Sequence, residues 1–196
     1  MRETEVTVQC FNSLDEIFEI LQNSGWVETS KFQLNDWYFS KCSLAELKEM
    51  NYAELLINSF LVREMIKEGV SENSILYKSK FFDNNGNVIS EVKTSSRISD
   101  IKSTLQIYKN AGLTMWCGLE NTSYVYKKNN VEFVIQEVKD VGIFIELEEY
   151  EDIKDCSDRE KFDILVKTLQ STNLDLGNDF SCKKVFVKFH KEKPSN

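Results

Sequence analysis

The sequence predicts an α+β fold, an eight-stranded antiparallel β-barrel with helices packed outside it. Extended segments rich in β-branched and aromatic residues are joined by turn sequences such as Asp83-Asn-Asn-Gly86, which indicates hairpins. Helices are predicted where a serine stands three residues before a glutamate. Pro194 is the one proline, so proline interrupts no strand or helix. Because a long antiparallel meander hides its edges most simply by closing on itself, we expect a barrel.

The first half of the chain alternates strands with short helices. Residues 2–10 alternate as a strand does, and Ser13 and Glu16 then form a capping box for a helix that ends at Gly25. The same signature begins a short helix at Ser43. Further extended segments are predicted at residues 26–32, 36–39, 59–66, 75–82 and 88–92.

The second half is predicted to contain a meander between two helices. Ser99 opens the first helix, which ends at Gly112, and Ser157 caps the second. Residues 184–189 are predicted to close the fold as a strand. The strands of the meander are predicted at residues 113–126, 131–138 and 141–149.

Length and composition limit the class of protein. The 196 residues suit one domain, predicted at residues 1–190 with a flexible tail at 191–196. A net charge of −8 and an isoelectric point near 4.9 argue against a nucleic-acid partner and an anionic membrane surface. The amino terminus lacks the apolar core of a signal peptide, and no apolar run approaches the roughly 18 residues of a membrane span. We expect a cytoplasmic protein, as a monomer or a homodimer.

The numbers and spacing of cysteine and histidine argue against several kinds of metal site and catalytic mechanism. The five cysteines are odd in number, widely spaced and without a CxxC pair, which is typical of reduced thiols rather than of a disulfide framework or a zinc site. His190 is the only histidine, which argues against a Ser-His-Asp or Cys-His mechanism and against a histidine-rich metal centre.

Two predicted strands, from opposite ends of the chain, each carry a pair of glutamates. Glu146 and Glu148 are two residues apart, so their side chains point to one face of the strand and the apolar residues between and before them point to the other. Glu3 and Glu5 repeat this arrangement. One interpretation is two solvated strand faces. The other is convergence on a divalent cation, because Mg²⁺ and Mn²⁺ prefer carboxylate oxygens.

Six short motifs occur in an order typical of one protein family. They are Glu3-x-Glu5, Asp36-Trp-Tyr-Phe39, Phe60-Leu-Val-Arg63-Glu, Ile75-Leu-Tyr-Lys78, Val131-Glu-Phe-Val-Ile-Gln-Glu-Val138 and Gly142-Ile-Phe-Ile-Glu146-Leu-Glu148. With them, residues 2–150 resemble the CYTH family, which comprises class IV adenylyl cyclases, thiamine triphosphatases and other triphosphate tunnel metalloenzymes. The resemblance implies an eight-stranded tunnel in which acidic residues hold Mg²⁺ or Mn²⁺ and basic residues bind a triphosphate.

The resemblance also implies roles for individual residues. The metal ligands that it implies are Glu3, Glu5, Glu146 and Glu148. Arg63 and Lys78 match basic residues of the family and are predicted to be catalytic and to bind substrate. Lys80 and Lys93 share strand faces with the matched residues and are predicted to bind substrate as well. The alternatives are solvated surface for the lysines, and for Arg63 a structural salt bridge to Glu5 or Glu146.

The sequence departs from the family at five positions. Basic residues of the family are replaced here by Thr7, Leu61, Asn121 and Ser123. An acidic residue is replaced by Gln136. Each lost charge-assisted hydrogen bond weakens anion binding by roughly 1.5 to 3 kcal/mol. Replacement charge at the tunnel mouth is predicted from three lysines near the carboxy end: Lys183, Lys184 and Lys188.

Three functions follow from these residues. The first is metal-dependent hydrolysis or cyclisation of a triphosphate, the substrate being a nucleotide, thiamine triphosphate or polyphosphate. The second is a degenerate tunnel that binds a nucleotide or polyphosphate as a sensor. The third is a scaffold for a protein partner. The glutamate pairs favour the first function over the third, because carboxylates that face one tunnel repel one another without a cation.

Overall fold

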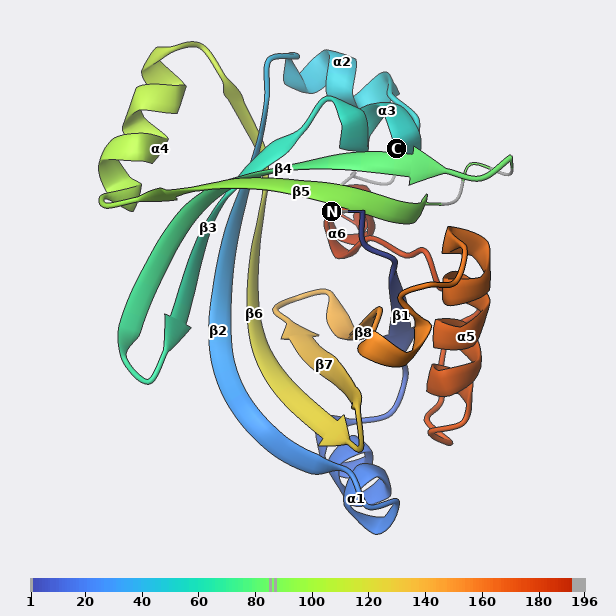
Figure 1. Cartoon of the computed structure of the whole chain (residues 1–196). Helices are drawn as coiled ribbons and strands as arrows, with labels where there is room; N and C mark the ends of the chain where they lie inside the picture. Colours follow the sequence, from blue (N-terminus) through green and yellow to red (C-terminus); the bar gives the residue numbers. More distant parts are fainter. Residues whose placement is uncertain (1, 85, 87, 192–196) are drawn as a thin grey trace.

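The computed structural model describes residues 2–84, 86 and 88–191. Its strands form one antiparallel sheet, in the order β1-β8-β7-β6-β2-β3-β4-β5, that curls into a half-barrel (Figure 1). The eight strands of this part of the chain are β1 (Glu5–Cys10), β2 (Val27–Ser40), β3 (Phe60–Lys67), β4 (Val70–Phe82), β5 (Val88–Ile98), β6 (Thr114–Lys128), β7 (Val131–Val138) and β8 (Gly142–Glu148). The predicted α+β class with eight antiparallel strands is confirmed.

The edge strands β1 and β5 meet at a single point. Glu3 and Glu91 form an isolated antiparallel bridge, in which each backbone N–H donates to the other residue's carbonyl oxygen at 2.8 Å. The Asp158 carboxylate reinforces this seam, because it accepts a hydrogen bond from the Ser90 hydroxyl at 2.8 Å and lies 3.0 Å from the Arg2 guanidinium. The predicted barrel is therefore a half-barrel whose edges are held together by a short seam rather than by a continuous ladder.

Helices lie at both ends of the sheet and along one outer side, and one further helix lies against the concave face (Figure 1). Those of the described residues are α1 (Leu14–Asn23), α2 (Leu44–Glu49), α3 (Tyr52–Ile57), α4 (Ile101–Asn110), α5 (Asp158–Gln170) and α6 (Lys184–Lys191), with a 3-10 turn at Glu151–Ile153. The capping boxes predicted at Ser13, Ser43 and Ser157 are all present. None of the helices in this part of the chain is long and apolar enough to cross a membrane.

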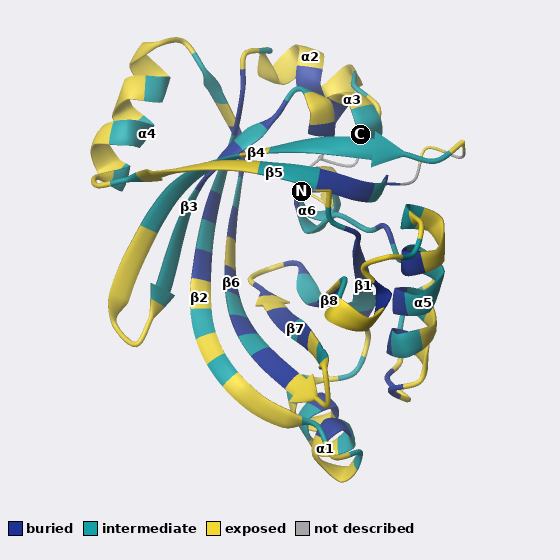
Figure 2. Ribbon diagram, viewed as in Figure 1, coloured by how far each residue is buried: buried dark blue, intermediate teal, exposed yellow. Residues whose placement is uncertain are grey.

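The main core lies between the sheet and the helices α1 and α5. On β1 and β8, alternate residues point outward and are buried against Ile17 and Leu21 of α1 and Leu165 and Leu169 of α5. Figure 2 shows buried residues on β1 and β7, whereas β4 contains no buried residue. Because one strand face is committed to this core, the glutamates on the other face must point into the half-barrel.

The predicted strand at residues 184–189 is wrong, because this segment forms the helix α6. Its sequence alternates as a strand does, yet it also places Val185 and Phe189 four residues apart, on one helical face. Both are buried, and they pack on inward-facing apolar side chains such as Leu119 of β6 and Phe144 of β8. The helix therefore lies against the concave face of the sheet, where a ninth strand would have no edge to pair with.

Several boundaries also differ from the prediction. Helix α3 was not predicted, although Asn51 and Glu54 form its capping box, and the N-cap of α4 is Asp100 rather than Ser99. Strands β4 and β5 are longer than predicted, because their ladder continues to the Asn73–Ile98 pair. Asn85 of the predicted turn and residues 192–196 of the predicted tail lie outside the described residues, and Lys191 belongs to α6.

Candidate metal and anion site

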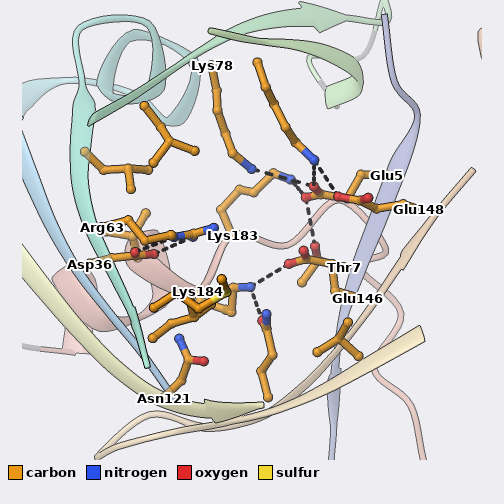
Figure 3. A pocket seen from close by; sticks show the side chains of 18 of the residues that line it. Glu5, Thr7, Asp36, Arg63, Lys78, Asn121, Glu146, Glu148, Lys183 and Lys184 are labelled. Atoms are coloured by element: carbon orange, nitrogen blue, oxygen red, sulfur yellow. Dashed lines mark hydrogen bonds and ion pairs between the residues drawn. The ribbon is translucent and has the colours of Figure 1, made fainter. Parts of the chain in front are cut away.

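A cavity of about 420 Å³ lies between the concave face of the sheet and the start of α6. Every strand contributes to its lining, which includes Glu5, Arg63, Lys78, Glu146 and Glu148 (Figure 3). A volume of this size falls in the range of roughly 300 to 1,000 Å³ that is usual for small-molecule sites. Of the six side chains predicted to face one cavity, these five do so, and Glu3 is not among the lining residues.

Three of the four predicted metal ligands converge in this cavity. One carboxylate oxygen from each of Glu5, Glu146 and Glu148 lies within 4.8 Å of the others. The register explains this convergence, because β1 and β8 pair Glu5 with Glu148 and Thr7 with Glu146 at alternate positions of the ladder, which point to the same face. Glu3 stands apart from the group and forms an ion pair with Lys93 at 3.0 Å. That these carboxylates bind a metal remains a prediction.

The donor set fits a hard divalent cation. Glu5 is 5% exposed, and its Oε2 is buried without a hydrogen bond among the described residues. Burial alone would raise the pKa of Glu5, but Lys183 and three further lysines hold that pKa well below its ordinary value. Burial raises the pKa of Glu148, against the effect of Lys93. An ionised, incompletely bonded carboxylate beside two others is a suitable ligand for Mg²⁺ or Mn²⁺.

The lysines predicted on β4 and β5 do line the cavity. Lys78 lies 2.7 Å from Glu91 and 3.7 Å from Glu5, and Lys80 also forms an ion pair with Glu91. Lys93 lies 2.5 Å from a carboxylate oxygen of Glu148. These three lysines are therefore not ordinary solvated surface residues.

Two more cations come from the segment that leads into α6. Lys183 donates a hydrogen bond to Glu5 at 3.0 Å, and Lys184 donates to Glu146 at 2.6 Å and also to the Gln136 amide oxygen. Both lie inside the cavity rather than at its mouth, since α6 folds against the concave face. Lys188 instead donates to the Gly118 carbonyl oxygen at 2.8 Å. Lys184 thus supplies positive charge from a segment that was predicted to be a strand, and Lys183 supplies it from the residue before that segment.

Arg63 forms a structural ion pair with a partner that was not predicted. Its Nε and Nη2 donate to the two carboxylate oxygens of Asp36, each at 2.7 Å. The two residues are direct partners in the ladder between β2 and β3, and Asp36 is 3% exposed. Burial opposes the charge of Arg63, but Asp36 raises the pKa of the guanidinium above its ordinary value. The alternative prediction, that Arg63 forms a salt bridge with Glu5 or Glu146, is wrong.

The ion-pair network around the cavity is balanced. Its six cations are Arg63, Lys78, Lys80, Lys93, Lys183 and Lys184, and its six carboxylates are Glu3, Glu5, Asp36, Glu91, Glu146 and Glu148. Each of the three converging carboxylates has a lysine partner within 3.0 Å. An anion that enters such a network must compete with carboxylates for the lysines, and a cation must compete with lysines for the carboxylates. Cation and anion are therefore expected to favour each other's binding.

Lys80 gives the site a pH-dependent contribution to stability. Burial, reinforced by the charges of Lys183 and Lys78, lowers its pKa to about 7, from an ordinary value of 10.5. Between these values the unfolded chain holds more protons than the folded chain, so the Lys80 contribution to the free energy of unfolding grows as the pH rises. In urea titrations across this window, native protein should gain stability more steeply than Lys80→Met. Parallel pH profiles for the two proteins would contradict the assignment.

The fold is shared with solved structures of low sequence identity. PH1819 protein from Pyrococcus horikoshii superposes with a TM-score of 0.73 at 20% identity, over 96% of this chain and 99% of that one. A proposed adenylyl cyclase from Hippeastrum with a dominant triphosphatase activity has a TM-score of 0.62 at 14% identity, over 96% of this chain and 95% of that one. The fold is that of the CYTH family. No family model and no curated protein matches the sequence.

Positions that depart from the CYTH pattern are arranged around the same cavity. Thr7, Leu61, Asn121 and Gln136 line it, so the replaced side chains do occupy inward positions. Ser123 is fully buried, and its hydroxyl donates to the Asn121 amide oxygen at 2.9 Å. Part of the cationic lining of the cavity, Lys183 and Lys184, instead comes from the carboxy-terminal segment of the chain.

Proposed function

We propose that the protein binds a triphosphate together with Mg²⁺ or Mn²⁺ in the cavity and hydrolyses it. The convergence of Glu5, Glu146 and Glu148 opposite a group of buried lysines carries this proposal. Carboxylates that hold a divalent cation beside ammonium groups that contact phosphate oxygens are the usual parts of a phosphoryl-transfer site. The likeness to a proposed adenylyl cyclase with a dominant triphosphatase activity supports the same class of reaction.

Each group has a distinct role in this proposal. The divalent cation neutralises phosphate oxygens when it is bound. Lys78, Lys183 and Lys184 turn from their carboxylates to the phosphates and stabilise the negative charge that develops during transfer. Lys80 stays paired with the buried Glu91 and supplies counter-charge to that carboxylate when Lys78 turns to the phosphates. Arg63 keeps Asp36 on its Nε and Nη2 and offers the anion its remaining N–H groups.

A binding module that senses a nucleotide or polyphosphate is the second candidate. The balanced ion-pair network favours it, because every cation of the network already has a carboxylate partner. To bind a ligand, the lysines need only exchange their carboxylate partners for phosphate oxygens. To catalyse a reaction, they must also bind the transition state more strongly than the substrate.

A turnover panel separates the two candidates. ATP, thiamine triphosphate and tripolyphosphate are incubated with Mg²⁺ or Mn²⁺, and phosphate release is resolved from cyclic AMP. We expect metal-dependent phosphate release from at least one substrate, with a loss of about 10²-fold or more in Lys78→Met, because removing a transition-state donor typically has an effect of that size. Lys139→Met is the matched control, since Lys139 pairs with Glu120 on the outer surface.

The outcomes of the panel are distinct. Phosphate release identifies a triphosphatase, and cyclic AMP identifies a cyclase. Tight metal-dependent binding without either product would support the binding module, and equal activity in the Lys78 and Lys139 variants would contradict the role given to Lys78.

A further inference from the structure

The edge strand β5 is paired on only one of its sides for about half of its length. Its ladder with β4 continues from Glu91 to Ile98, whereas its other side meets β1 at Glu91 alone. The opposite edge of the sheet is covered, because the backbone of β1 bonds to the segment of residues 175–181. In Figure 2 the half of β5 next to α4 is exposed, whereas the half next to β1 is buried.

Alternation along β5 determines which backbone groups point to this uncovered side. Those of Glu91 do, because its N–H donates to Glu3 and its carbonyl oxygen accepts from Glu3, each at 2.8 Å. Backbone groups two residues apart in an antiparallel strand point to the same side, so those of Lys93, Ser95 and Arg97 do as well. None of these three makes a backbone hydrogen bond on that side with another described residue. They therefore form a row of donors and acceptors to which a further strand can bond.

The contact between β1 and β5 shows which side chain suits an added strand. Glu3 is bridged to Glu91, and its carboxylate lies 3.0 Å from Lys93, the next residue of β5 on the same face. Ser95 and Arg97 stand in the same relation to each other as Glu91 and Lys93 do. A carboxylate opposite Ser95 on an added strand would therefore reach the Arg97 guanidinium.

Arg97 is available for such a carboxylate. Its side chain is exposed, and it forms no ion pair with any residue that the structure describes. Its partner on β4 is the uncharged Ser74. Because an exposed ion pair contributes little affinity, the backbone hydrogen bonds would supply most of the binding and Arg97 would supply selectivity for an acidic residue.

A second copy of the chain fits this edge less well. When two antiparallel β5 strands pair about Ser95, Lys93 of each copy lies opposite Arg97 of the other. When they pair about Arg97, the two arginines lie opposite each other. Like charges that face each other directly across a ladder are destabilising, so the charge on the edge favours an acidic partner.

We propose that the uncovered edge of β5, at Ser95 and Arg97, binds an extended acidic segment of a partner protein, which joins the sheet as a further strand. The segment pairs with the backbone of β5 and places a carboxylate beside Arg97. This inference is independent of the proposed function, because neither Ser95 nor Arg97 lines the cavity.

Two short peptides that differ in one charge test this inference. The acidic peptide is acetylated and amidated Thr-Val-Glu-Val-Thr, and the basic peptide has lysine in place of the glutamate. Each is titrated into isotopically labelled protein, and the backbone amide signals are followed by NMR. The acidic peptide should shift the amide signals of residues 93–97 saturably. The basic peptide should bind about five- to tenfold more weakly, because a weak ion pair is replaced by a repulsion of similar size.

Two variants separate the backbone contribution from the charge. Ser95→Pro removes an N–H that points away from β4, so the sheet should be kept while binding is lost. Arg97→Glu should reverse the preference, so that the basic peptide binds more tightly than the acidic one. Lys127→Glu is the matched control, because Lys127 is an exposed lysine on β6, and it should leave the preference unchanged. Melting curves confirm that each variant folds.

Several results would overturn the inference. They are the absence of saturable shifts at millimolar peptide, equal affinity for the two peptides, and a preference that Arg97→Glu leaves intact. Binding that survives in folded Ser95→Pro would also contradict strand addition. Shifts of the same amide signals that depend on protein concentration alone would assign the edge to a second copy instead.

Discussion

Asp36→Ala should lower the free energy of unfolding by about 3 kcal/mol. The change removes the carboxylate that receives both hydrogen bonds from Arg63 and leaves a mostly buried guanidinium without its counter-charge. Removing one partner of a buried pair typically has an effect of about 3 to 5 kcal/mol. The lower end applies here, since the Arg63 side chain is 28% exposed and water can reach it. Urea unfolding followed by circular dichroism measures the change.

A double variant separates the effect of the ion pair on stability from the effect of the packing around it. Asp36→Leu with Arg63→Met replaces the pair by apolar side chains beside Leu61 and Met65, and should recover most of the stability lost in Asp36→Ala. Glu120→Ala, which breaks the exposed pair with Lys139, should change stability far less. If Asp36→Ala were no more destabilising than Glu120→Ala, Arg63 would be free to act chiefly as an anion ligand.

A divalent cation should tighten tripolyphosphate binding by roughly 5- to 150-fold, the range given by coupling free energies of about 1 to 3 kcal/mol. Without the cation, the anion must take Lys183 and Lys184 from Glu5 and Glu146, which leaves these carboxylates without counter-charge. When the cation takes over the carboxylates, the lysines become available to the phosphates. Calorimetric titration of tripolyphosphate with and without Mn²⁺ measures the factor.

The glutamates that the cation contacts should be needed for this gain. In Glu146→Gln with Glu148→Gln, two of the three converging carboxylates lose their charge, and Mn²⁺ should no longer tighten tripolyphosphate binding. Glu137→Gln is the matched control, because Glu137 is exposed and stands next to the inward-facing Gln136 on β7. A gain in affinity that survives in the double variant would place the cation elsewhere.

Features that depend only on residues close together in the sequence were predicted correctly. The capping boxes at Ser13, Ser43 and Ser157 were found where predicted, because a serine and the glutamate three residues later complete each box without help from the rest of the chain. Strand parity likewise placed Glu146 and Glu148 on one face, and the outward packing of Ile145 and Leu147 fixes which face is inside.

Tertiary contacts determined what the sequence could not reveal. Residues 184–189 satisfy both a strand and a helix period, and the choice depends on the concave surface against which Val185 and Phe189 pack. With that segment assigned to a strand, Lys183 and Lys184 could not be placed beside Glu5 and Glu146. The Asp36–Arg63 pair depends on the register between β2 and β3, which the residues of neither strand determine alone.

Manganese binding followed by electron paramagnetic resonance tests the central claim most directly. The claim is that Glu5, Glu146 and Glu148 hold a divalent cation next to a bound triphosphate. Mn²⁺ should bind weakly to the protein alone and more tightly with tripolyphosphate, by the factor that calorimetry gives for the reciprocal effect. The Glu146→Gln, Glu148→Gln variant should show no such increase. Mn²⁺ binding that is the same in native protein and double variant, with tripolyphosphate present, would contradict the claim.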